Sequence, residues 1–169
     1  MHILSIDNPT SFSFSIDQIE LLKAYIETSY ELYVNGNTVP ISLRVGQPYP
    51  KTLTQDWIGQ GLAVITAWNP ASQFMSLQEN RERQKSLKAD LMAGPGQVFD
   101  AIGRSITGPW AEESLAVTNI SLEDAIQVGV TYGQNAILWV ASEKTPVVAL
   151  CKPFWDSAKL DPTVYLTSG

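Results

Sequence analysis

The feature that most constrains this chain is a run of seven residues, Leu62 to Trp68, which reads LAVITAW and is almost wholly apolar. Such a run, partly β-branched, is typical of a central strand buried on both faces. It ends at Asn69-Pro70, a pair that turns the chain. We therefore expect a sheet that is built around this strand.

The residues after this strand predict alternating helices and strands. A capping box of Ser76 and Glu79 opens the first helix, and Gly94-Pro95 follows its end. The order strand, helix, strand, strand, helix, strand predicts an α+β fold. We expect the ferredoxin-like split βαβ type, with an antiparallel sheet and two packed helices. The expected helices are 76–93 and 121–132, and the expected strands are 98–106, 114–120, 136–141 and 147–150.

The segment before the central strand predicts a helix and a short hairpin. Ser15 and Gln18 form a capping-box pattern, and apolar residues then recur at helical spacing over 16–31. Two short strands over 32–45 surround a turn at Asn35-Gly36, and Pro40 places the second near an edge. We expect 46–60 to be a loop. The whole chain, 1–169, is expected to form one domain, with irregular termini at 1–14 and 152–169.

The predicted topology brings three loops to one edge of the sheet. If the four strands lie in the order 4-1-3-2, the loop after Asn69 is flanked by the connections 108–114 and 132–135. Polar side chains would therefore converge there, with Trp68 or Trp110 as a wall. These polar residues are Asn69, Ser72, Glu112, Ser114, Gln134 and Asn135.

Two amides share the apolar stripe of the helix 76–93. Asn80 and Gln84 occupy the same stripe as Leu77, Leu87 and Leu91. Buried amides need hydrogen-bonding partners, which could be protein groups or a ligand. The basic residues of this helix alternate with acidic ones, so we interpret them as a solvated face. These basic residues are Arg81, Arg83, Lys85 and Lys88.

Composition narrows the classes of function. Eleven basic and seventeen acidic residues give a net charge of −6 and a pI near 4.7, which argues against nucleic acid as a partner. Cys151 is the single cysteine and is expected to be a buried hydrophobe; with no signal-peptide pattern, we expect a cytoplasmic protein. No apolar run is long enough to span a membrane, so no membrane partner is expected. The single histidine, His2, excludes Ser-His-Asp chemistry and His-rich zinc sites.

Four strings resemble the bacterial DUF3293 family: AVITAWNPAS, SLQEN, WAEES and YGQNAILW. The resemblance spans about 30–140, and the family name denotes a domain of unknown function. It therefore implies no reaction, cofactor or substrate. Carried over by position, it singles out Thr66, Trp68, Asn69, Pro70, Ser72, Glu79, Asn80, Trp110, Glu112, Ser114, Gly133 and Gln134.

Our first hypothesis is a polar pocket that binds a small molecule, such as a nucleotide or metabolite. Glu112 is the candidate general acid or base, although it could also be a solvated carboxylate or a Mg²⁺ ligand with Asp100 or Glu113. No zinc or nucleotide motif occurs, and we predict no metal. The alternative is a non-catalytic module that binds another protein. Catalysis, any cofactor and the oligomeric state stay open. The candidate binding residues are Asn69, Ser72, Asn80, Trp110, Ser114 and Gln134.

Overall fold

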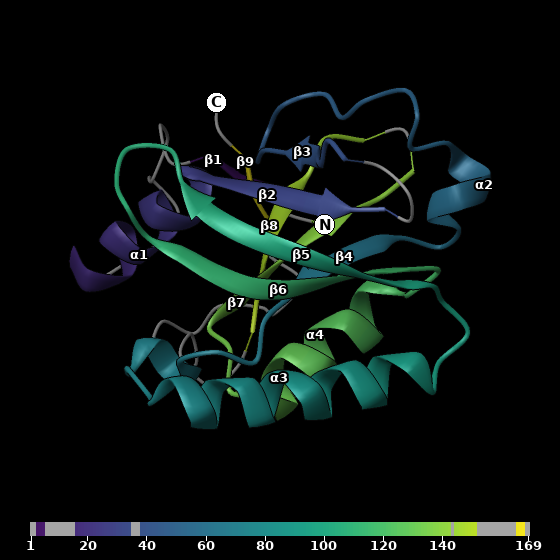
Figure 1. Cartoon of the computed structure of the whole chain (residues 1–169). Coiled ribbons are helices and arrows are strands. Elements are labelled where there is room, and N and C mark those ends of the chain that lie inside the picture. Colours follow the sequence, from purple (N-terminus) through teal and green to yellow (C-terminus); the bar gives the residue numbers. More distant parts are fainter. Residues whose placement is uncertain (1–2, 6–15, 35–37, 143, 152–164, 168–169) are drawn as a thin grey trace.

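The computed structural model describes residues 3–5, 16–34, 38–142, 144–151 and 165–167 (Figure 1). Its strands form one nine-stranded sheet in the order β1-β9-β8-β7-β4-β6-β5-β2-β3. Paired neighbours are antiparallel, apart from β1 and β9, which are parallel. With the helices, this gives an α+β fold. The strands are β1 (Ile3–Ser5), β2 (Thr28–Tyr33), β3 (Ile41–Leu43), β4 (Leu62–Ile65), β5 (Val98–Ser105), β6 (Ala111–Thr118), β7 (Ala136–Val140), β8 (Val147–Leu150) and β9 (Tyr165–Thr167).

The apolar run forms the centre of the sheet, as expected. All four residues of β4 are buried, and the strand pairs with β6 on one side and β7 on the other. The order β7-β4-β6-β5 corresponds to the predicted order 4-1-3-2. The order and the strand directions are therefore confirmed. The ferredoxin-like assignment stays a prediction, because these strands belong to a longer sheet.

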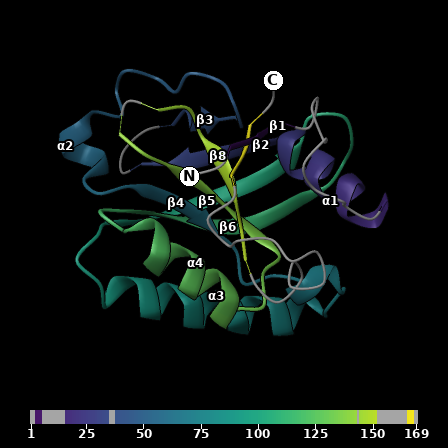
Figure 2. The same cartoon turned by 180° about the vertical axis from the view of Figure 1, so that it is seen from behind.

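Two helices cover one face of the sheet, below it in Figure 1 and again in Figure 2. They are α3 (Leu77–Met92) and α4 (Leu122–Thr131). The capping box of Ser76 and Glu79 is present at the start of α3. Leu87 and Leu91 of α3 join Ala125 of α4 in a core cluster with Ile65 of β4. The two helices and their caps are therefore confirmed.

The other face of the sheet packs against α1 (Ile16–Ile26). The sheet curls around this second core, which joins Leu22 of α1 to Leu32 of β2 and Val148 of β8. The backbone N–H of Gly46, after β3, donates to the carbonyl of Pro146, before β8, at 2.9 Å. A concave face therefore lies beside α1.

Several expected boundaries are wrong. The first helix ends at Ile26 rather than residue 31, because 28–33 alternates buried and half-buried side chains as strand β2. The expected loop 46–60 contains a one-turn helix, α2 (Gln55–Ile58), capped by Thr54. β6 begins at Ala111, three residues before the expected Ser114, so Glu112 lies within a strand.

The two termini contribute strands that the sequence analysis missed. β1 and β9 pair with each other, and β9 also pairs with β8, so 3–5 and 165–167 are not irregular. The hairpin of β2 and β3 is confirmed, with β3 at the edge of the sheet. The expected cap at Ser15 and the turn at Asn35-Gly36 lie outside the described residues. Within the described residues, no helix combines the length and apolar character needed to cross a membrane.

Candidate functional site

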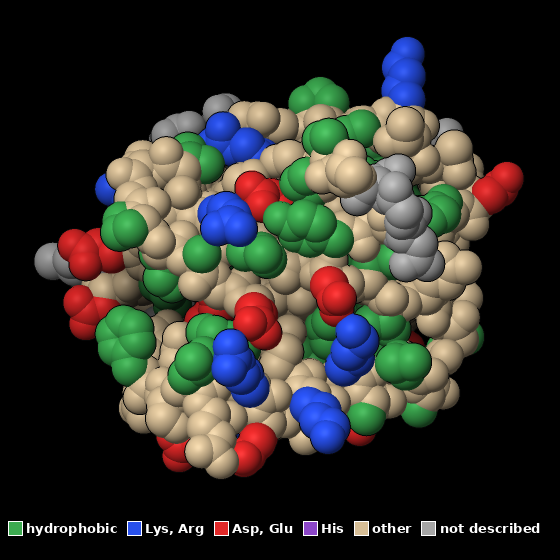
Figure 3. All heavy atoms as spheres, viewed as in Figure 1, with side chains coloured by type: hydrophobic (Ala, Val, Ile, Leu, Met, Phe, Trp, Pro, Cys, Tyr) green, Lys and Arg blue, Asp and Glu red, His purple; other side chains and the backbone are tan. Residues whose placement is uncertain are grey.

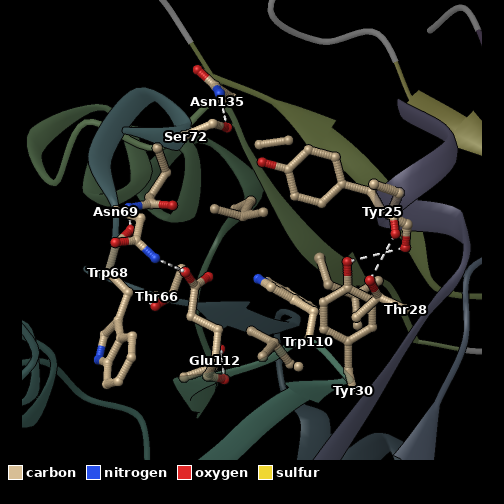
Figure 4. A pocket seen from close by; sticks show the side chains of 18 of the residues that line it. Tyr25, Thr28, Tyr30, Thr66, Trp68, Asn69, Ser72, Trp110, Glu112 and Asn135 are labelled. Atoms are coloured by element: carbon tan, nitrogen blue, oxygen red, sulfur yellow. Dashed lines mark hydrogen bonds between the residues drawn. The ribbon is translucent and has the colours of Figure 1, made fainter. Parts of the chain in front are cut away.

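A cavity of about 340 Å³ opens at the end of the sheet where β4 ends and β6 and β7 begin. It lies on the face that carries α1 (Figure 4). Its volume is in the range of small-molecule pockets. Residues from α1, β2 and the loop after β4 face one another across it. The polar and aromatic residues that line it include Tyr25, Thr28, Tyr30, Thr66, Trp68, Asn69, Ser72, Phe74, Trp110, Glu112, Ser114, Gln134 and Asn135.

The amide of Asn69 has a fixed orientation at the cavity wall. Its Oδ1 accepts from the Met75 backbone N–H at 3.1 Å and from Asn80 Nδ2 at 3.0 Å. Because two donors hold the oxygen, Nδ2 must point the other way, and it donates to Glu112 Oε1 at 2.8 Å. Asn69 therefore presents a preorganised donor to the carboxylate.

Glu112 offers its second carboxylate oxygen to the cavity (Figure 4). Among the described residues, Asn69 is the side chain that hydrogen-bonds this carboxylate. Burial raises the pKa of Glu112, while the Asn69 hydrogen bond lowers it, and burial has the larger effect. Such a carboxyl group can hold a ligand donor or exchange a proton with a bound molecule.

Aromatic side chains form much of the remaining wall. The Tyr30 hydroxyl donates to the Tyr25 carbonyl at 3.2 Å, and Trp110 lies between Glu112 and Tyr30 in Figure 4. Burial raises the pKa values of both tyrosines, so both stay neutral at physiological pH. The Trp110 ring packs over Gly103, where a Cβ would stand 3.5 Å from the ring. The wall therefore combines apolar ring faces with the carboxylates of Glu27 and Glu112.

The loop after β4 has an unusual backbone. Asn69, Ala71 and Ser72 all have positive φ, at 44°, 53° and 58°. Such conformations are costly for non-glycine residues and concentrate at functional sites. The Ala71 N–H donates to the Gly133 carbonyl at 2.8 Å, and Ser72 Oγ accepts from Asn135 Nδ2 at 3.0 Å. The connection 133–135 therefore holds this strained loop in place.

Arg83 fixes the same two segments from behind. Its Nε donates to the Ala67 carbonyl at 2.7 Å, and its Nη2 donates to the Tyr132 carbonyl. The guanidinium also lies 6.0 Å from the centre of the Tyr132 ring. The interpretation of this basic residue as part of a solvated face is therefore wrong. Sequence spacing could have placed Arg83 between Asn80 and Gln84 on the inner side of α3, although not its two carbonyl partners.

The structure brings together most of the predicted site residues. The predicted contact between the loop after Asn69 and the connections 108–114 and 132–135 is confirmed by the bonds to Glu112, Gly133 and Asn135. The Gln134 amide donates to the Trp68 carbonyl at 3.0 Å, so its nitrogen is used in holding the loop. The predicted residues that line the cavity are Asn69, Ser72, Trp110, Glu112, Ser114 and Gln134.

Asn80 is the exception. It is only 2% exposed and is not among the lining residues. Its Oδ1 accepts from the Asn69 backbone N–H at 2.9 Å, and its Nδ2 donates to Asn69 Oδ1 and to the Met75 carbonyl. Gln84 Oε1 accepts from the Ala67 N–H at 3.0 Å. Both amides of the stripe therefore bond to groups of the protein itself, and the contact of Asn80 with a ligand stays a prediction.

The part of the cavity wall that α1 and β2 form was not predicted from the sequence. Tyr25, Thr28 and Tyr30 line the cavity, and Thr28 Oγ1 donates to the Ala24 carbonyl at 2.7 Å. The period-two alternation of Thr28, Tyr30 and Leu32 was the available signal for the strand. The curl of the sheet, which brings this strand opposite Glu112, has no local signal in the sequence.

The alternative of a magnesium site with Asp100 or Glu113 has no support. Asp100 pairs with Lys88 at 2.7 Å, and Glu113 follows Glu112 on a strand, where successive side chains point to opposite faces. In the part of the chain that the structure describes, no three His, Cys, Asp or Glu residues are grouped to hold a metal. Cys151 is fully buried, as expected, and burial raises the pKa of its thiol to about 12.

Residues 65–137 match the family model described as "Protein of unknown function (DUF3293)". The resemblance to the DUF3293 family is thereby confirmed. The matched DUF3293 segment is shorter than the expected 30–140, but it contains Asn69, Asn80, Glu112 and Gln134. Tyr25 and Tyr30 lie outside it. No curated protein and no solved structure matches the chain.

Proposed function

We propose that the cavity binds a small polar organic molecule through a hydrogen bond to Glu112. One observation carries this proposal: Asn69 fixes one oxygen of a half-buried carboxylate while the other faces the cavity. A carboxylate accepts hydrogen bonds, so the ligand would supply a donor there. Aromatic rings would cover its apolar part.

A nucleotide is the less suitable ligand within this class. Among the described lining residues none is a lysine or arginine, whereas the lining includes Glu27 and Glu112. Phosphate groups are usually held by cations or by helix N-termini, and a carboxylate repels them. We therefore favour a metabolite without phosphate groups.

A catalytic role for Glu112 is part of the same proposal. Its pKa is raised by burial toward neutral pH, which would favour a role of the carboxyl group as a general acid or base on a bound molecule. The four central strands and two helices would be a ferredoxin-like scaffold whose loops build the site. The single, buried Cys151 supports a cytoplasmic setting.

The test is a ligand screen with a matched pair of variants. The wild type, Glu112→Gln and Glu113→Gln would be screened against a metabolite library by thermal shift, with hits followed by calorimetry. We expect hits whose affinity falls at least tenfold in Glu112→Gln and is retained in Glu113→Gln. Hits that bind both variants as tightly as the wild type would contradict the proposal.

The alternative, a module that binds another protein, is favoured by apolar side chains at the mouth of the cavity. Phe74 and Trp110 both line the cavity, and their side chains are 93% and 44% exposed. If this surface binds a second copy of the chain, sedimentation would show concentration-dependent association that Phe74→Ser abolishes. A monomer at all concentrations would exclude a second copy.

The nucleic-acid expectation stays a prediction. On the face shown in Figure 3, basic side chains are interspersed with acidic ones. Two basic residues are paired with acidic ones, Lys88 with Asp100 at 2.7 Å and Arg104 with Glu31 at 2.9 Å. That face therefore offers no uniform basic surface to a phosphate backbone.

A further inference from the structure

We propose that the ligand of the cavity is an organic cation, a protonated amine whose N–H groups contact Glu112 and whose body packs on the aromatic wall. This inference rests on the proposed function and names the chemical class of its ligand. It follows from three properties of the cavity: its charge, its ring faces and the acceptor that it leaves open.

The charge of the cavity is uncompensated. Glu112 and Glu27 are the carboxylates among the lining residues, and no lysine or arginine is among the described ones. Two nearby guanidinium groups have other partners. Arg83 donates to the Ala67 and Tyr132 carbonyls, and Arg104 pairs with Glu31. A half-buried carboxylate without a counterion favours a cationic ligand, because the ligand then supplies the missing charge.

The rings suit a cation as well. Trp110 extends between Glu112 and Tyr30, and Tyr25 faces them from α1 (Figure 4). The face of an aromatic ring carries partial negative charge and attracts an ammonium group within about 6 Å. The carboxylate and the aromatic ring faces surround one small volume, and both therefore attract a cation. An anionic ligand would meet repulsion from both.

The carboxylate oxygen of Glu112 that faces the cavity is the acceptor for the ligand. Asn69 is held as a donor to Oε1 by Met75 and Asn80, so this oxygen already has a protein partner. The oxygen that faces the cavity can then accept from an N–H or O–H of the ligand. An alcohol can supply that hydrogen bond but not the charge, so it is the proper comparison for an amine.

Protonation of Glu112 should compete with the ligand. The groups that face Glu112 are Tyr25 from α1 and Tyr30 from β2, both neutral, and the exposed Glu27 at the end of α1. No other charged group lines the described cavity. A cation binds the ionised carboxylate, so its affinity should rise with pH and level off above the pKa of Glu112.

The experiment is a titration of the full chain, followed by ¹⁵N–¹H NMR, with three probes of similar size. The probes are benzylamine, benzyl alcohol and phenylacetate at pH 7.5, and the reporters are the Asn69 amide and the Trp110 indole N–H. We expect benzylamine to bind at least tenfold more tightly than either other probe. We expect its affinity to fall between pH 7.5 and pH 4.5, because a pKa raised by burial leaves most of the Glu112 carboxyl groups protonated at pH 4.5.

Variants then test whether Glu112 and Trp110 cause the preference for the amine. Glu112→Gln should reduce benzylamine binding to the level of benzyl alcohol, whereas Glu113→Gln should leave it unchanged. Trp110→Leu should weaken benzylamine severalfold more than benzyl alcohol. Thermal unfolding of each variant confirms that it is folded. The comparison of the three probes on the wild type tests the inference even if a variant does not fold.

The outcomes separate the inference from the proposed function. Equal or tighter binding of benzyl alcohol or phenylacetate, or an amine preference that survives in Glu112→Gln, overturns the cation inference and leaves the cavity as a binding site. If none of the probes shifts Asn69 or Trp110 at 20 mM while a library hit does, the cation inference alone is overturned. If no library compound shifts them either, both proposals are contradicted.

Discussion

Asn80 is the residue whose role the structure changes most. A ligand-facing amide and a structural amide give opposite results on removal, because only the second leaves protein groups unpaired. The Asn69 N–H, the Asn69 Oδ1 and the Met75 carbonyl all bond to Asn80. We predict that Asn80→Leu lowers the free energy of unfolding by about 1–3 kcal/mol, measured by urea denaturation.

The matched control is Gln78→Leu, an exposed amide on the same helix that bonds Glu82 at 3.0 Å. Loss of an exposed pair at this spacing costs only about 0.2–0.5 kcal/mol. An unchanged or raised stability in Asn80→Leu would show that the amide is not needed for folding. It would then favour a role in binding, as in sites where function and stability conflict.

Glu112 carries the second prediction at this scale. Burial raises its pKa above the ordinary value of 4.5, so the folded protein holds the proton more tightly than the unfolded chain. The contribution of Glu112 to stability therefore falls as pH rises from 4.5 to the folded-state pKa, and is constant above it. Glu112→Gln lacks this titration. Its stability relative to the wild type should increase over that pH interval.

Urea denaturation of both proteins between pH 4 and pH 8 measures this difference. Glu113→Gln, on the same strand, controls for the loss of one negative charge. A stability difference between Glu112→Gln and the wild type that stays flat or declines with rising pH would show that the carboxylate is not penalised by burial. The electrostatic support for a ligand cation would then be lost.

The sequence could show that Asn80 is buried but not what it bonds. Its position on the same stripe as Leu87 and Leu91 follows from the helical period, which can be recognised in the sequence. Its partners lie in a loop whose path depends on positive φ at Asn69, Ala71 and Ser72. Glycine is the strongest sequence signal for that conformation and asparagine a weaker one, so Asn69 gives a weak signal and Ala71 and Ser72 give none.

At the scale of elements, Arg83 links α3 to two chain segments. One guanidinium donates to the carbonyl that follows β4 and to the carbonyl that ends α4. We predict that Arg83→Met, which keeps the apolar stem, lowers the free energy of unfolding by about 1.5–3 kcal/mol, the usual range for hydrogen bonds to charged groups. Denaturation of Arg81→Met, an exposed site on the same helix, should differ by less than about 0.5 kcal/mol.

Binding is the second measurement for this pair. Because Arg83 does not line the cavity, its loss should weaken ligands only through the position of the loop 69–72 and the connection 132–135. Equal effects of Arg83→Met and Arg81→Met on stability would mean that the two carbonyl bonds contribute little. That result would support the interpretation that the basic residues of α3 form a solvated face.

Elements with strong local signals were predicted well, and the others were not. The apolar run of β4 and the capped, periodic helices α3 and α4 lie where the sequence placed them. The end of α1 was missed because Tyr30 fits a helical stripe as well as a strand. The start of β6 was missed because the adjacent glutamates Glu112 and Glu113 interrupt the apolar pattern, and only pairing with β5 makes this segment a strand.

At the scale of the molecule, successive residues of the central strand contribute to different cores. Val64 belongs to the cluster with Leu22 of α1, and Ile65 to the cluster with Leu87 of α3. If either core unfolded, one face of the sheet that both cores share would become exposed to solvent. This arrangement supports the prediction that the chain is one domain, which sequence length alone could only suggest.

The consequence is a single unfolding transition that responds to both cores. We predict that Leu22→Ala and Leu87→Ala, on opposite faces, each lower the free energy of unfolding by about 2–5 kcal/mol, because each removes a side chain that is at most 1% exposed. Tryptophan fluorescence and far-ultraviolet circular dichroism should give coincident urea curves in both variants. If Leu22→Ala instead split the two curves, α1 and its core would unfold separately. The cavity wall that contains Tyr25 would then belong to a less stable unit than the wall that contains Glu112.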